Sequence, residues 1–172
     1  MTRSSAAVVA VVATICCALA GCGKTVATKT STSSTTSTPT STTSPAKSAA
    51  AVYVAAATKV DAALNTFDSS VDNWPSSETG ARAQPSAQRA IDALKAFMAS
   101  LENYEWPLGA SSDILTLISA AGTLVGDLEG LAYVKLISSS SWASEFSNDV
   151  QSVSLDSNIV RHDLGLRSAS SG

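Results

Sequence analysis

Apolar residues in the second part of the sequence recur at intervals of three and four, which is the spacing of one face of an α-helix. In the first such stretch they are Val60, Leu64, Phe67, Val71 and Trp74, with Val52 and Ala56 continuing the pattern backwards. In the second they are Ile91, Leu94, Met98 and Leu101. Pro75 forbids continuation of the first helix. Pro85, a favoured first helical position, opens the second helix, which ends at Trp106-Pro107.

Two further stretches have the same spacing. The third helix is expected to begin after Ser111 or Ser112, either of which can cap it. Its apolar residues are Ile114, Leu117, Ala121, Leu124, Leu128 and Leu131. The fourth helix is expected to start near Ser140 or Ser141 and to end at Gly165. Its apolar residues are Trp142, Phe146, Val150, Val153, Val160 and Leu164.

These stretches lie in residues 49–172, a length that suffices for one core of ordinary size. The connections between them are short, roughly four to ten residues, and short connections place consecutive helices antiparallel. No segment alternates for long as a β-strand would. The sequence therefore predicts an all-α domain, an antiparallel up-down four-helix bundle whose core is formed by the four apolar stripes.

Three glycines, Gly122, Gly126 and Gly130, lie four residues apart within the third stretch. Each costs up to about 1 kcal/mol relative to alanine in a helix interior, so a compensating role is expected. A neighbouring helix, or the rings of Trp142 and Phe146, could fill the groove beside them, or the helix could end by Gly126 or Gly130. The alternative is a face that receives a partner helix or an acyl chain, as small-residue repeats do in membrane helices.

Acidic residues recur in two helical stretches. Asp149, Asp156 and Asp163 are seven residues apart in the fourth, and a second set is close together in the first: Asp61, Asp68 and Asp72. Paired acids can hydrolyse glycans or hold calcium. Because each acid sits beside a core position rather than in a loop, solvated flanks of the helices are the favoured interpretation.

His162 is the only histidine, and it lies near the end of the fourth stretch, where a cation interacts favourably with the helix dipole. A structural or surface role is therefore favoured for it. A zinc or di-iron site needs more ligands, and the sequence has no HExxH, no GxSxG and no phosphate-binding glycine loop. We predict no catalytic residue, no metal site and no cofactor.

The N-terminal part of the chain carries a different signal. Residues 6–20 contain no charged residue, follow a leader with one positive charge, and end in Leu19-Ala20-Gly21-Cys22. This is the layout of an export signal. The fifteen apolar residues are too few for a bilayer-spanning helix, which needs about 20. The pattern and its position resemble the lipobox of bacterial lipoproteins.

This resemblance implies that the thiol of Cys22 takes up a diacylglycerol and that the chain is then cut between Gly21 and Cys22. The mature protein would be exported and anchored to the outer face of the cell membrane by two acyl chains, since one alone binds only marginally. Cys16 and Cys17 would leave with the signal peptide, residues 1–21. No thiol would then remain for a disulfide, a cysteine metal cluster or a nucleophile.

Residues 22–48 are predicted to form a disordered linker. Between residues 30 and 44, fourteen of fifteen residues are Ser or Thr and the other is Pro39. Such a segment buries almost nothing apolar and cannot offset the entropy of ordering itself. Its composition resembles the spacers behind the lipobox in actinobacterial, particularly mycobacterial, envelope lipoproteins, and both a bare and a glycosylated linker are compatible with it.

The charges separate along the same boundary. Residues 49–172 carry seven basic and fourteen acidic residues, a net charge of −7, so we expect no nucleic-acid partner. Three functions fit a tethered acidic bundle, in decreasing order. The first is a non-catalytic module that binds an envelope protein or scaffolds a cell-wall assembly. The second is a carrier of lipid or another amphiphile between opened helices, and the third is a carboxylate-dependent hydrolase.

Overall fold

The computed structural model describes residues 45–75 and 77–167 of the chain. All regular structure in these residues is helical, and the four long helices pack against each other. They are α1 (Pro45–Val71), α2 (Gly80–Glu102), α3 (Leu108–Gly130) and α4 (Trp142–Asp163). Two single turns of 3-10 helix, η2 (Leu131–Tyr133) and η3 (Ile137–Ser139), connect α3 to α4. The predicted all-α helical bundle is confirmed.

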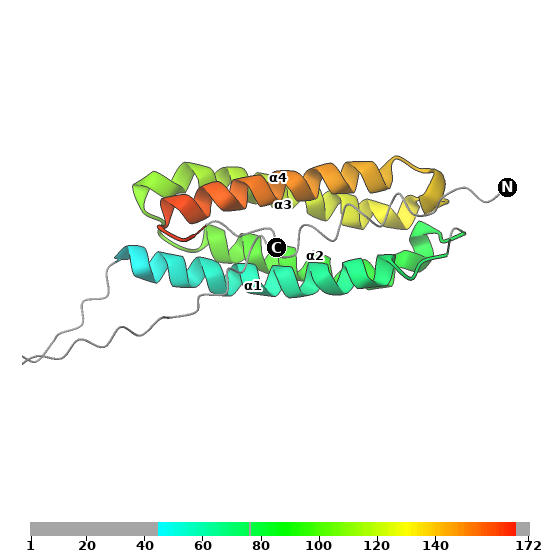
Figure 1. Cartoon of the computed structure of the whole chain (residues 1–172), viewed down its shortest axis with the longest axis horizontal. Helices are drawn as coiled ribbons and strands as arrows, with labels where there is room; N and C mark the ends of the chain where they lie inside the picture. Colours follow the sequence, from blue (N-terminus) through cyan, green and yellow to red (C-terminus); the bar gives the residue numbers. More distant parts are fainter. Residues whose placement is uncertain (1–44, 76, 168–172) are drawn as a thin grey trace, which may run out of the picture.

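The helices run alternately up and down the bundle (Figure 1). α1 packs on α2, α2 on α3 and α3 on α4. Pro45, the α2–α3 connection (residues 103–107) and the last turn of α4 therefore share one end of the bundle, which we call the entry end. The α1–α2 and α3–α4 connections share the opposite end, which we call the far end.

α4 meets α1 through long side chains. The hydroxyl oxygens of Tyr53 and Ser157 lie 2.7 Å apart, in the half of the bundle nearer the entry end. Toward the far end, the rings of Phe67 and Phe146 meet edge to face with centroids 5.6 Å apart. Such aromatic pairs add about 0.5–1.5 kcal/mol beyond the area that they bury. These contacts close the bundle between its first and last helices.

The predicted core is confirmed for α3 and α4, where every residue of both apolar stripes is buried. The prediction for the start of α1 was wrong in phase. Tyr53 and Ala57 are buried there, whereas Val52 and Ala56 are only half-buried. Alanines occupy most positions between residues 49 and 57, so the apolar pattern fits several helix faces equally well and only Tyr53 decides among them. Val71 and Trp74 are half-buried as well.

α2 begins at Gly80 rather than at Pro85, which lies inside the helix. The chain at Gly80 passes so close to η2 that a Cβ there would lie 1.6 Å from the carbonyl oxygen of Leu131, and the Gly80 N–H donates to the Val134 carbonyl at 2.7 Å. Only glycine tolerates this approach. The proline is accommodated at the cost of one backbone hydrogen bond near the helix start.

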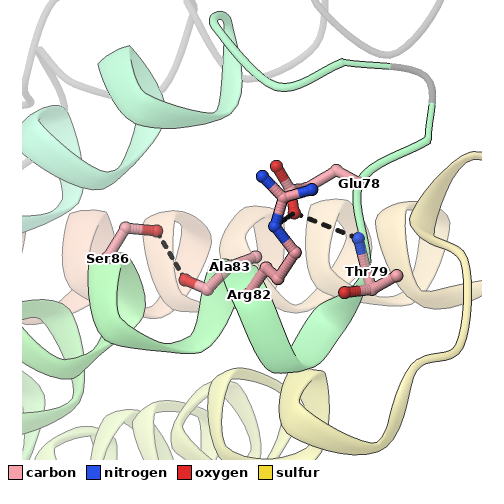
Figure 2. Close-up of polar contacts among 5 residues, drawn as sticks. All are labelled: Glu78, Thr79, Arg82, Ala83 and Ser86. Carbon is pink, nitrogen blue, oxygen red and sulfur yellow. Dashed lines mark hydrogen bonds and ion pairs between the residues drawn. The ribbon is translucent and has the colours of Figure 1, made fainter.

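The first turn of α2 is also held by Glu78, which is buried (Figure 2). Its Oε1 accepts the backbone N–H of Thr79 at 3.1 Å and lies 3.6 Å from Nε of Arg82. The Glu78 carbonyl accepts the N–H of Ile137, which ties the α1–α2 connection to η3. An anion beside the unpaired N–H groups of a helix start is stabilising, so this carboxylate fixes α2 and the far end together.

Two helix ends complete the comparison. α3 begins at Leu108 rather than after Ser111 or Ser112, because the carbonyl of Pro107 already accepts the N–H groups of Ala110 and Ser111. α4 ends as predicted at Gly165, whose φ is +69°. The Leu166 N–H donates to the Arg161 carbonyl and the Gly165 N–H to the His162 carbonyl, which is the Schellman pattern. In α2 the sequence analysis missed Phe97, which is buried where Met98 was expected.

Candidate functional site

The outward surface of α3 is uncharged along nearly its whole length. We call it the outer α3 face and define it by the exposed residues of this helix: Leu108, Gly109, Ser112, Leu115, Thr116, Ser119, Gly122, Thr123, Gly126 and Glu129. The one charged member, Glu129, accepts a hydrogen bond from Nζ of Lys95 on α2 at 2.6 Å. Leu115 in the middle of this face is 67% exposed.

The three predicted glycines fall on or beside this face. Gly122 and Gly126 are exposed and Gly130 is half-buried at the last position of α3. A Cβ added at Gly126 or Gly130 would meet no atom within 4 Å, and one added at Gly122 would reach only Sδ of Met98 at 3.9 Å. The expectation that a neighbouring helix or the rings of Trp142 and Phe146 fill this groove was therefore wrong. For Gly130 the helix end predicted as an alternative is observed.

α3 is also the most membrane-like element among the described residues. The segment Leu108–Tyr133 is long and apolar enough to cross a membrane by length and composition, with a mean hydropathy of 1.4. Only 33% of that stretch is buried inside the bundle. A helix that is apolar on all sides but half-open to solvent presents apolar or small side chains outward, which is the surface described above.

The heptad acids of α4 face α3 rather than open solvent alone. Asp163 lies beside Asp113, and a hydrogen bond between the two carboxyl groups raises the pKa of Asp113. Asp149 lies beside Asp127, whose pKa is raised to about 6 by burial and by this neighbour. The interpretation of these acids as solvated flanks was wrong for the Asp149 pair. Two carboxyl groups that share a proton resist simultaneous ionisation, so this interface is sensitive to pH.

Buried polar groups lie between α1 and α4. Asp61 is 6% exposed, its Oδ2 accepts no hydrogen bond, and burial raises its pKa to about 7 although the charge of Arg161 acts in the opposite direction. Arg161 is itself buried, and its Nε donates to the Arg167 carbonyl at 2.9 Å. Burial also raises the pKa of Tyr53 to about 12, partly offset by its hydrogen bond with Ser157.

Sequence reasoning missed this group of residues. Asp61 was expected on a solvated flank, and Arg161 was noticed only as a neighbour of His162. The one signal that could have found them is helical phase, because Asp61 follows the core residue Val60 directly and Arg161 follows the core residue Val160. Such positions lie at the edge of the core, where burial depends on how far apart the two helices stand.

The remaining predicted residues occupy separate places. His162 is exposed, with Nδ1 at 3.3 Å from Oδ1 of Asp163, as expected for a surface histidine. No group of three His, Cys, Asp or Glu side chains suited to a metal ion occurs in residues 45–75 and 77–167. The predicted lipidation and cleavage positions, Gly21 and Cys22, lie outside the described residues.

Comparisons with known proteins place no constraint on these surfaces. No protein-family model, curated protein or solved structure matches the chain.

Proposed function

We propose that this chain is a membrane-anchored lipoprotein of the cell envelope whose helical bundle is a non-catalytic binding module. A diacylglycerol on Cys22 anchors it to the outer face of the cell membrane, and residues 23–44 hold the bundle away from the bilayer. The Leu19-Ala20-Gly21-Cys22 pattern supports the anchor. The Ser/Thr-rich segment ends directly before α1 begins at Pro45, which supports its role as a linker.

The observation that carries the binding function is the outer α3 face. Its small and uncharged side chains run the length of a helix of 23 residues, and Gly122 and Gly126 leave open space above the backbone. Small residues in a row let another helix approach closely. The rest of the domain is acidic, so this face is the natural place for an apolar helix of an envelope protein to pack against the bundle.

The carrier function has less support from the same residues. An acyl chain held between opened helices requires the glycines to line the interior, whereas Gly122 and Gly126 face outward and the core stripes of α3 and α4 are fully buried. The glycines therefore support the partner helix, which binds on the outside, over the enclosed lipid.

Substitution of Gly126 by leucine tests this function. The added side chain meets no neighbour in the bundle, and leucine favours a helix over glycine by about 0.5–1 kcal/mol, so the variant should be at least as stable as the wild type. It would, however, fill the space that the partner needs. The matched control is Ala62→Leu at an exposed position of α1.

The assay is affinity capture from the native envelope with the wild-type chain and both variants, after their thermal midpoints have been compared. We expect one or more envelope proteins to be captured by the wild type and by Ala62→Leu and to be lost with Gly126→Leu. Identical captured proteins for all three chains would show that the outer α3 face is not the binding surface.

A further inference from the structure

The entry end of the bundle carries an exposed apolar tip. Leu108 at the start of α3 is 96% exposed, the highest value among the exposed large apolar residues of the described chain. Directly before it, the rings of Tyr104 and Trp106 pack at a tilt with centroids 4.7 Å apart. We call these three residues the docking tip. Apart from this tip, apolar side chains at this end of the bundle are mostly packed into the core.

The tip is rigidly held. Nε1 of Trp106 donates to the carbonyl of Leu101 at 2.6 Å, which fixes the ring against the last turn of α2. Pro107 caps α3 and restricts the backbone directly before Leu108. A side chain presented on a fixed backbone loses little entropy when it is buried by a partner.

The place where the chain enters the bundle indicates what covers this tip. α1 begins at the entry end, so the segment that leads to Cys22 joins the bundle beside the α2–α3 connection (Figure 1). Residues 22–44 behave as a flexible coil of roughly 26 Å root-mean-square length if the segment is unmodified. An anchor of that length keeps the entry end, and not the far end, within reach of the bilayer.

We propose that the docking tip inserts Leu108 into the outer leaflet of the bilayer that carries the lipid anchor, with Tyr104 and Trp106 at the level of the lipid headgroups. Tyrosine and tryptophan favour this interfacial region because one end of the ring is apolar and the other polar. The inference rests on the proposed lipid anchor. It adds that the bundle touches the membrane with a defined end and so presents the outer α3 face at a steep angle to the surface.

The contact is apolar rather than electrostatic. Glu102, Glu105 and Asp163 are exposed at the entry end, and the exposed cations Lys47 and Arg167 only partly offset them. Anionic lipid should therefore bring no gain in contact, and added salt should not break it. This distinguishes the docking tip from a polybasic membrane-binding segment, which salt releases.

The three tryptophans of the chain make this testable. Trp74 and Trp142 pack together at the far end with ring centroids 6.4 Å apart, and Trp106 is the tryptophan of the entry end. The full lipidated chain is reconstituted into phosphatidylcholine vesicles whose acyl chains are brominated, and quenching of tryptophan fluorescence is compared with that in unbrominated vesicles. Flotation and intact mass of the same samples establish that the chain is anchored.

We expect quenching in the wild type that disappears in Trp106→Phe and weakens several-fold in Leu108→Glu. Tyr133→Glu, a matched change at an 88% exposed residue of the far end, should leave it unchanged. Chains that float with the vesicles but show no quenching, or quenching that survives Trp106→Phe, would overturn the docking tip and leave the anchor intact. Chains that carry no lipid and do not float would overturn both proposals. Dichroism spectra of the variants establish that each is folded.

Discussion

Replacing Asp61 by asparagine should change how the stability of the bundle depends on pH. Asp61 is buried between α1 and α4, its Oδ2 has no hydrogen-bond partner, and burial raises its pKa from 3.8 to about 7. Asparagine has nearly the same shape and does not titrate. The comparison of the two chains therefore isolates the free energy of ionising one buried carboxyl group.

The direction follows from proton linkage. A carboxyl group whose pKa is higher in the folded state binds its proton more tightly there, so its contribution to stability is fully present below the unfolded pKa and is lost as the pH rises through the folded value. For Asp61 this window extends from pH 3.8 to about pH 7. A shift of this size corresponds to about 4 kcal/mol, and relaxation around the ionised group can reduce the effect to about 2 kcal/mol.

The assay is urea denaturation followed by tryptophan fluorescence between pH 4 and pH 8, on chains that begin at residue 22. The wild type should lose about 2–4 kcal/mol relative to Asp61→Asn across this range, while the other shifted acids change both chains alike. Asp92→Asn on the exposed surface of α2 controls for the loss of one charge. A difference between wild type and Asp61→Asn that is constant from pH 4 to pH 8 would refute the buried, proton-binding state of this carboxyl group.

Three further substitutions test the packing. Gly126→Ala should raise the free energy of unfolding by about 0.5–1 kcal/mol, because its Cβ meets nothing; a destabilised variant would mean that the outer α3 face is occupied by part of the bundle. Gly80→Ala should destabilise by more than about 2 kcal/mol, because its Cβ would collide with the Leu131 carbonyl; an unchanged thermal midpoint would contradict the close approach of α2 and η2. Leu124→Ala should cost about 2–5 kcal/mol, since Leu124 is fully buried, and a neutral melting result would contradict the assigned core.

The sequence was sufficient to predict the helices and most of the core, because large apolar side chains define the phase of a helix. In α3 and α4, residues such as Leu117 and Phe146 leave one face that can be buried, and that face is buried. At the start of α1 the alanines are equally acceptable on every face, so the phase was lost. The start of α2 depends on a contact between Gly80 and Leu131, fifty-one positions apart in the chain, which no local pattern encodes.

The candidate surfaces were less predictable for a related reason. The spacing of Gly122 and Gly126 identifies a helix face, but whether a neighbour covers that face depends on the position of α2 and α4 around α3. Asp61 and Arg161 lie at the edge of the core, and they are buried because Tyr53 and the rings between α1 and α4 hold those helices at a distance that encloses them. These properties arise from packing between helices rather than from the sequence of any one helix.

The most direct test of the proposed function is the intact mass of the protein extracted from the membrane of cells that process lipoproteins. We predict a chain that begins at Cys22, lacks residues 1–21 and carries the mass of a diacylglycerol on its first residue, and we predict that Cys22→Ala abolishes this modification. A chain that retains Met1, or one that begins elsewhere with an unmodified Cys22, would contradict the lipid anchor on which the proposed function rests.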